Sequence, residues 1–434
     1  MFNHMAFFSK AKSGKQTHSA TASATPVSAS AQNLDVVAQR SVIEHRDFLL
    51  GQVPSGKPFG IGLLDVDGLT LCESLYSDID LPVFTAATVD GWAVRASNLV
   101  GASPNRPIGL PVVDSITAAV LPVEPLIPGT AVRVVPGAPV PEGADAVVAL
   151  SDGEEVEGGV NFFTEVPFHK NLIQAGSRIG DGAPLLPAGT VLNPRLIAML
   201  AEVGHDKVLA LPKPRVVIGA VGADLLDPGK PLTQLAQHYD ATTAMLTSAV
   251  RTAGGHAYPI GIMPSNAREL AATLREQILV ADLILLVAQD TPELRMVLSK
   301  LGEIDRAEVA ISPAGTSLFA RIGEQKTPVL VLPANVVSAY VSYEVFALPL
   351  VRKLAGSDPL ERESVAVASS QGIHADPQRT QFVLATQTPR GVTPVKIGEH
   401  AGGVELAQAN ALIVLAPGLE VAFGQNALCW LLDQ

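Results

Sequence analysis

Apolar stretches alternate with helical patterns between residues 214 and 356, and this alternation constrains the fold more than any other feature of the chain. Strands that alternate with helices build βαβ units whose strands run parallel. Pro292 stands at the first position of one expected helix, Gly254 closes another, and Ser265 can cap a third. The sequence therefore predicts a central α/β domain with a parallel sheet. Its strands are PRVVIGAVG, HAYPIGI, ADLILLVA and TPVLVLP, and its helices are ATTAMLTSAVRTAGG, SNARELAATLREQIL, TPELRMVLSKLG and VVSAYVSYEVFALPLVRKLAG.

The segments before and after this domain have a different sequence pattern. SVIEHRDFLL (41–50) fits a short amphipathic helix, and valine-rich runs broken by Pro and Gly predict a β module that follows it. A return segment ends in a helix, PRLIAMLAEVG, and strand-rich sequence resumes after the α/β domain. We expect domain I at 34–70 with 165–213, domain II at 71–164, domain III at 214–356 and domain IV at 357–434, after a Ser- and Ala-rich tail, 1–33, that is typical of disorder.

Charge and cysteine usage exclude several classes of protein. The 434 residues carry a formal net charge of −12, which argues against a nucleic-acid binder. No apolar run approaches the roughly 18 residues of a transmembrane helix, and Lys10 follows the first apolar residues too soon for a signal peptide. Neither the two cysteines, Cys72 and Cys429, nor the nine histidines show metal-site spacing. These features indicate a cytoplasmic protein that does not insert into a membrane.

Five short motifs, in the same order along the chain, resemble the MoeA family of molybdopterin molybdenumtransferases, which includes the E domain of gephyrin. LPVFTAATVDGWAVR (81–95) is similar to the family's LPPFxxSxMDGYAVR, and GAPVPEGADAVV (137–148) is similar to GAPLPxGADAVV. The other matches are DPGKPL (227–232), VLPANVVSA (331–339) and LVRKLAG (350–356). The resemblance implies an elongated four-domain protomer of class α/β plus β, with two small β domains and a central parallel domain similar to MoaB and MogA. It also implies a homodimer, with the active site between the α/β domain and the partner's β module.

Several positions depart from the family's motifs where the family binds its ligands. The family's glycine-rich segment after the third strand is shortened here to Gln-Asp-Thr-Pro, so no glycine pair remains to let a phosphate approach the backbone. Ser312 and Gly315 occupy the positions of two lysines that would neutralise phosphate and oxyanion charge. The changes remove cations, glycines and carboxylates from the expected ligand surface. The further replacements are Pro136, Ile173, Gln174, Val221, Ala223, Ala334 and Val336.

Four residues survive at functional positions of the family: Asp90, Asn335 and Ser338, with Asp224, which keeps a carboxylate where the family's S-T-G-D-E-L reads AVGADLL (220–226). The resemblance implies that they are the remains of a catalytic site. The residues themselves also fit a structural interpretation, because Asp90 with Gly91 suits a turn between short strands. Asn335 or Ser338 can likewise cap the long helix that follows.

The substitutions predict a chain that is not an enzyme, with no cofactor and no metal. The first hypothesis is a gephyrin-like dimeric scaffold for a partner peptide, concentrated at the division site. The resemblance to gephyrin-like proteins of actinobacteria makes the C-terminal tail of the division protein FtsZ the first candidate and a membrane receptor tail the second. The expected groove includes Arg40, Arg46 and Phe48, although each of these can instead face solvent or core. The alternative is an active molybdopterin molybdenumtransferase that inserts molybdate into adenylylated molybdopterin with Mg²⁺.

Overall fold

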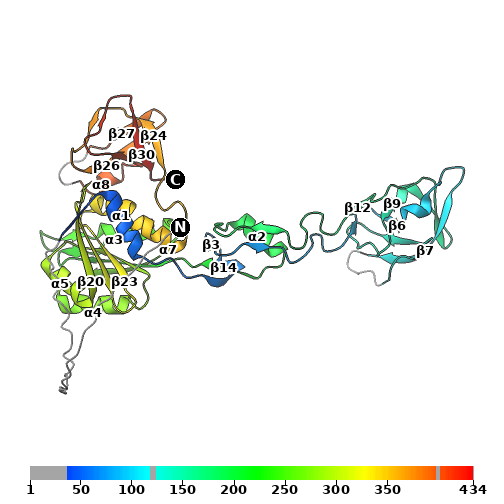
Figure 1. The fold of residues 1–434 in the computed structure, drawn as a ribbon, viewed down its shortest axis with the longest axis horizontal. Coiled ribbons are helices and arrows are strands. Elements are labelled where there is room, and N and C mark those ends of the chain that lie inside the picture. The colour runs from blue at the N-terminus through cyan, green and yellow to red at the C-terminus, as the bar shows by residue number, and fades with distance from the viewer. Residues whose placement is uncertain (1–36, 118–123, 397–400, 434) are drawn as a thin grey trace, which may run out of the picture. The chain divides into compact units, whose positions relative to one another are not determined.

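The computed structural model describes residues 37–117, 124–396 and 401–433, and Figure 1 shows their helices and strands in chain order. The tail expected at 1–33 lies outside these residues. The predicted α/β plus β class is confirmed. One seven-stranded sheet is packed against helices, and two six-stranded sheets are formed mainly by the segments before and after it.

The seven-stranded sheet has the order β1-β20-β22-β23-β19-β15-β18. The four strands predicted from the sequence run parallel to one another. The sheet is nevertheless mixed, because β22 is antiparallel to β20 and β23, with which it is joined by connections too short for a parallel crossover. The bounds are β1 Ala38–Arg40, β15 Arg215–Val221, β18 His256–Met263, β19 Leu283–Val287, β20 Gly302–Val309, β22 Thr316–Ile322 and β23 Thr327–Leu332.

Helices cover both faces of this sheet, because alternate residues of a strand point to opposite sides. Val216 and Ile218 of β15 belong to one apolar core with α1, α3, α6 and α7. Val217 of β15 belongs to a second core with α4 and α5. The bounds are α1 Val42–Gln52, α3 Ala241–Thr252, α4 Ala267–Gln277, α5 Pro292–Leu301, α6 Val336–Ser342, the π-helical turn η4 Tyr343–Ala347, and α7 Leu348–Ala355.

The helix ends follow the predicted signals, with two differences. Pro292 opens α5, and Gly254 adopts a φ of 84° just after α3. Ser265 does not cap α4. Asn266 does, because its side chain is one residue nearer and accepts from Arg268 N at 3.0 Å. The long helix predicted after β23 is continuous but contains the π turn η4 between α6 and α7.

A six-stranded sheet from residues 91–162 has the order β10-β11-β7-β8-β6-β9. Trp92 packs edge-on against Phe162 in its core, with ring centroids 5.8 Å apart. A Cβ on Gly91 would lie 1.9 Å from the carbonyl oxygen of Val148, so β6 and β9 can pair this closely only at a glycine. The bounds are β6 Gly91–Val94, β7 Ile108–Ile116, β8 Ala131–Val134, β9 Ala146–Ala149, β10 Gly153–Val156 and β11 Gly159–Phe162, with the short 3-10 helices η2 Ala96–Leu99 and η3 Leu150–Asp152.

The return segment pairs with residues before the β module. β14 pairs with both β2 and β3, β13 pairs with β4, and β12 pairs with β5. Strands β2, β3, β4, β13 and β14 share a core that includes the side chains of Val66, Leu71 and Leu200, whereas Ala87 of β5 and Leu172 of β12 belong to a separate core. The bounds are β2 Phe59–Gly62, η1 Leu63–Asp65, β3 Thr70–Leu71, β4 Leu75–Tyr76, β5 Ala86–Ala87, β12 Leu172–Ile173, β13 Pro184–Leu186, α2 Pro194–Glu202 and β14 Lys207–Leu211.

The third sheet has the order β21-β26-β28-β30-β24, with β27 paired to β26. Strand β21 joins it from the α/β segment. No helix within the described part of the chain is long and apolar enough to cross a membrane. The bounds are β21 Ile311–Ser312, β24 Ser364–Ala368, β25 Ile373–His374, β26 Thr380–Thr388, β27 Gly391–Pro394, α8 Gly403–Leu406, β28 Ala411–Leu415, β29 Glu420–Val421 and β30 Asn426–Leu431; the remaining pair is β16 Leu225–Leu226 with β17 His238–Tyr239.

Candidate active site

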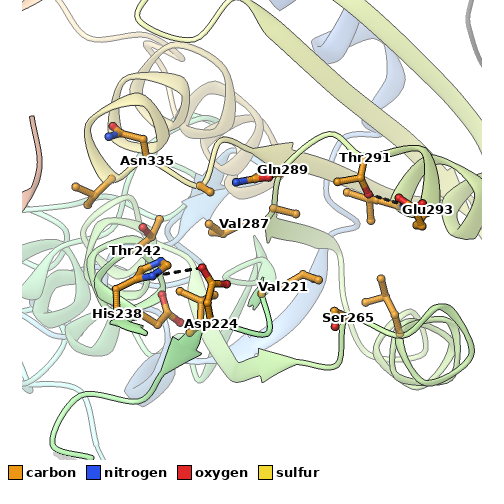
Figure 2. A pocket seen from close by; sticks show the side chains of 18 of the residues that line it. Val221, Asp224, His238, Thr242, Ser265, Val287, Gln289, Thr291, Glu293 and Asn335 are labelled. Atoms are coloured by element: carbon orange, nitrogen blue, oxygen red, sulfur yellow. Dashed lines mark hydrogen bonds and ion pairs between the residues drawn. The ribbon is translucent and has the colours of Figure 1, made fainter. Parts of the chain in front are cut away.

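A cavity of about 740 Å³ lies at the carboxyl ends of the parallel strands β15, β18, β19 and β23. Val221 and Val287 end β15 and β19, Ser265 follows β18, and Ala334 follows β23; all four line the cavity (Figure 2). Ligands of open α/β sheets bind outside the carboxyl ends of the strands. The position of this cavity in the fold makes it the candidate active site.

Four helices begin at the cavity, since residues at the starts of α3, α4, α5 and α6 line it. Side chains cap two of these helices: Asp240 of α3 accepts from Thr243 N at 2.9 Å, and Thr291 of α5 accepts from Leu294 N at 3.2 Å. A helix N-terminus carries partial positive charge and backbone N–H groups without a partner inside the helix. Several such ends at one cavity favour an anionic ligand.

Four side chains that can carry charge near neutral pH line the cavity: Asp224, His238, Asp240 and Glu293. Asp240 and Glu293 lie at the starts of α3 and α5, where the helix dipole stabilises a carboxylate. Asp224 has no such helix. Instead, its Oδ2 faces His238 Nδ1 at 3.5 Å (Figure 2). No lysine or arginine is among the lining residues that the structure describes.

Backbone pairing fixes His238 beside Asp224. β16 and β17 pair in parallel, and the N–H of His238 donates to the carbonyl oxygen of Asp224 at 3.0 Å. The loop between the two strands is braced by Tyr239, whose hydroxyl donates to the carbonyl oxygen of Lys230 at 2.8 Å. The imidazole and the carboxylate are therefore held at one side of the cavity, although 13 residues separate them in the sequence.

The loop after β19 contains no glycine and is fixed by an ion-pair cluster. Gln289 lines the cavity (Figure 2). Asp290 accepts from Arg306 Nε at 2.7 Å, and its other oxygen lies 2.9 Å from Arg295 Nε. All three side chains are at least three-quarters buried. Asp290 thus ties the loop to α5 and β20, and the short sequence Gln-Asp-Thr-Pro forms a rigid wall of the cavity.

Replacing Asp290 with Ala should lower the free energy of unfolding by about 2 kcal/mol, because it leaves two largely buried guanidinium groups without this carboxylate. We expect less than the roughly 3–5 kcal/mol of a fully buried pair, since solvent reaches the cluster. Urea unfolding measures the difference. Glu303→Ala is a matched control on β20, where an exposed carboxylate pairs with Arg321 and Lys326, and it should change stability little. Equal losses of unfolding free energy for the two substitutions would contradict a stabilising role of the Asp290 ion-pair cluster.

The structure brings two of the four predicted site residues to the cavity. Asp224 lines it, and so does Asn335, whose side chain caps α6 by accepting from Val337 N and Ser338 N at 3.0 Å. Ser338 lies in the first turn of α6 and is not a lining residue. Asp90 lies in the bend before β6, 2.9 Å from Arg133 Nη2. The capping and turn interpretations therefore describe the contacts of Asn335 and Asp90.

The three residues of the expected peptide groove make contacts inside the chain. Arg40 donates to Asp305 at 2.8 Å and lies over the ring of Phe48, 3.9 Å from its centroid. Arg46 pairs with Glu361. Phe48 also packs edge-on against Phe319, with ring centroids 6.3 Å apart. These contacts anchor α1 and its preceding strand, which fits the structural alternative for each side chain.

Among the substituted positions, Val221, Ala334 and Val336 line the cavity. Ser312 instead belongs to β21 and pairs with Gln381 of β26. The Gln-Asp-Thr-Pro segment, which the sequence placed on the expected ligand surface, contributes Gln289 and Thr291 to the lining. The sequence interpretation missed His238 and Thr242. The other lining residues outside the predicted set are Gly222, Leu225, Tyr239, Asp240, Ala241, Ser265, Ala267, Leu270, Val287, Ala288, Glu293, Leu294 and Val297.

The side chains that the structure describes do not form a divalent-metal site. Within residues 37–117, 124–396 and 401–433, no group of three or more His, Cys, Asp or Glu gathers closely enough to hold a metal ion.

Comparison with known proteins gives relatives over nearly the whole chain. Residues 40–204 match the family model described as the MoeA N-terminal region (domain I and II). Molybdopterin molybdenumtransferase 2 of Mycobacterium tuberculosis is 30% identical over 408 residues, which cover 90% of this chain and 99% of that protein. The molybdopterin molybdenumtransferase of Bacillus subtilis is 28% identical over 80% of this chain and 83% of its own length.

Comparison with solved structures also finds MoeA proteins. The crystal structure of a molybdopterin biosynthesis MoeA protein from Pyrococcus horikoshii superposes with a TM-score of 0.80 at 24% identity, over 91% of this chain and 100% of that one. At this identity the likeness supports the fold, including the multi-domain arrangement of α/β and β segments.

Proposed function

The chain belongs to the MoeA family of molybdopterin molybdenumtransferases, and from this premise we propose that it transfers molybdenum from molybdate to adenylylated molybdopterin. The observation that supports this function is the cavity at the carboxyl ends of four parallel strands, where the N-termini of α3, α4, α5 and α6 meet. Phosphate groups and molybdate are anions, and helix N-termini offer them N–H donors and a favourable dipole.

The prediction of a non-catalytic scaffold for a division-protein tail is wrong. The curated relatives that span most of the chain are named as enzymes, so the prediction that the chain is not an enzyme is wrong as well. The same relatives are named for molybdopterin and molybdenum, which overturns the expectation of no cofactor. The alternative weighed from the sequence is the better interpretation.

The cavity offers complementary surfaces for such a substrate. Val221, Val287 and Val297 present apolar side chains against which a flat heterocycle can pack, while Gln289 and Thr242 can donate and accept hydrogen bonds at its edge. The phosphate end would lie toward the helix N-termini. In this arrangement the chain binds, orients and partly desolvates its substrates, which lowers the barrier by positioning.

The direct test is an insertion assay with the purified full chain, adenylylated molybdopterin and molybdate. We expect molybdenum to be transferred and the nucleotide to be released in equal amounts. The M. tuberculosis relative provides the positive control under the same conditions. No transfer by this chain while the relative turns over would refute the proposed function.

Filling the cavity should slow the reaction without unfolding the protein. Ser265 is an exposed lining residue that caps no helix, so Ser265→Trp should place an indole in the cavity mouth and lower the insertion rate by roughly 10-fold or more. Ser248→Trp is the matched control, because Ser248 is an exposed residue of α3 that does not line the cavity. Equal rates for the two variants would place the reaction elsewhere.

We also propose that the chain is a homodimer. Large apolar side chains such as Leu64, Leu235 and Phe423 are exposed on the single chain, and two-fold pairing is the commonest way to cover such surface. Light scattering at micromolar concentration should give about twice the 45.2 kDa of one chain. A mass equal to one chain would contradict the proposal.

A further inference from the structure

The candidate active site holds one basic side chain among the lining residues that the structure describes, and it is His238. The other lining groups that carry charge near neutral pH are the carboxylates of Asp224, Asp240 and Glu293. Two of these lie at helix starts, where the dipole offsets their charge. A dianionic substrate in this cavity therefore has backbone N–H groups and a single ionisable cation to neutralise it.

The geometry points to His238 as the residue that supplies positive charge to the transferred oxyanion, with Asp224 as its positioning residue. This inference rests on the proposed function, because molybdate is the oxyanion of that reaction. An imidazole is cationic when both ring nitrogens carry protons, and in that form it can donate from Nδ1 to a carboxylate and from Nε2 to a ligand. Nδ1 faces Asp224 Oδ2 at 3.5 Å, and Nε2 on the opposite side of the ring is left to donate to a ligand (Figure 2).

The pair is poorly explained as a stabilising contact. Both side chains are more than half exposed, and an exposed ion pair contributes only about 0–1 kcal/mol to stability. Its position is nonetheless fixed by main-chain pairing of β16 with β17 and by the brace from Tyr239 to Lys230. A rigidly placed but thermodynamically minor His–carboxylate pair at the edge of a cavity is the arrangement expected of a ligand contact.

The chain contains a matched control for this pair. His374 Nδ1 lies 3.2 Å from Glu420 Oε1, and both side chains are exposed on the β25–β29 pair, outside the cavity lining. Its contact is closer than the 3.5 Å contact of His238 with Asp224, but neither His374 nor Glu420 lines the candidate active site. Substitutions at His374 therefore remove the same kind of side chain without touching the candidate site.

The experiment is calorimetric titration of molybdate into the full chain loaded with adenylylated molybdopterin, for the wild type and four variants. His238→Ala and His238→Gln should weaken molybdate binding by about 10- to 10²-fold, the loss expected for one charge-assisted hydrogen bond. His238→Lys should restore most of the affinity, because it returns a cation. His374→Ala should bind as the wild type does. Melting temperatures within error of the wild type would establish that all four variants are folded.

The role of Asp224 has its own readout. Asp224→Asn should raise the KM for molybdate while changing kcat little, because the imidazole remains but loses the carboxylate that faces its Nδ1 and orients the ring. An unchanged KM would remove Asp224 from the inference.

Wild-type affinity in both His238→Ala and His238→Gln, or no molybdate binding by the wild type, would overturn the role of His238. Failure of the inference is distinguishable from failure of the proposed function. Molybdenum transfer that is indifferent to His238 would leave the function standing and remove the inference. Binding that depends on His238 without any transfer would do the reverse.

Discussion

Glu344→Ala is expected to lower the free energy of unfolding by about 3–5 kcal/mol, the cost of breaking a buried ion pair by removing one partner. Glu344 lies on the π turn η4, and its side chain is only 1% exposed. Both of its oxygens accept from Arg362, at 2.6 and 3.2 Å. Arg362 also donates to the carbonyl oxygen of Leu431 at 3.0 Å, so the pair joins the α6–α7 helix to strand β30. Without Glu344 the guanidinium stays largely buried and lacks its only carboxylate among the contacts described.

A double substitution separates this explanation from a simple packing defect. Glu344→Met with Arg362→Met removes both charges and keeps much of the buried volume, so it should be less destabilising than Glu344→Ala alone. Urea unfolding of the single and double variants gives the comparison. A double variant that loses the sum of the two single losses would show that the charges do not interact.

The framework of the α/β domain could be predicted from the sequence because its signals are local. Pro292 and Gly254 mark helix ends through their own backbone preferences, which tertiary structure does not override. The antiparallel edge of the sheet carries a weaker signal. Strand β20 reads GEIDRAEV, and its apolar pattern is interrupted by half-buried charges such as Asp305 and Arg306 that pair across elements.

The site was harder to predict, for a physical reason. Asp224 and Asn335 stand in segments that resemble the family's motifs. His238 reaches Asp224 only through the pairing of β16 with β17, and no periodic pattern in the sequence predicts that pairing. The error about activity has a related origin. A departure from the family's motifs need not remove a contact, because the N–H groups at a helix start are supplied by the backbone whatever the side chain is. Val336 illustrates this, since it is the first residue of α6 and lines the cavity.

The π turn that carries Glu344 also buries an imidazole. His45 of α1 is fully buried, with its ring edge-on to Phe346 of η4 at 5.0 Å and stacked near Phe48 at 6.2 Å. Burial, together with the positive charge of Arg40 3.3 Å from Nδ1, lowers the pKa of His45 to about 4, while Asp305 opposes the shift. The folded protein therefore holds His45 neutral at pH values where an unfolded chain protonates it, since free histidine titrates near 6.5.

The free energy of unfolding should consequently fall as the pH is lowered from about 6.5 to about 4. In this range His45 binds a proton in the unfolded state but not in the folded state. At 1.36 kcal/mol per pKa unit the full loss is about 3 kcal/mol, and it should level off below pH 4. His45→Phe keeps an aromatic ring between Phe48 and Phe346 and removes the titration. The difference between wild-type and His45→Phe unfolding free energies, measured by urea at pH 7, 5.5 and 4, should therefore change by that amount between pH 7 and pH 4. If the difference in unfolding free energy did not change with pH, the folded protein would bind a proton at His45 as readily as the unfolded chain does. The packing of α1 against η4 would then have to open in acid to admit that proton.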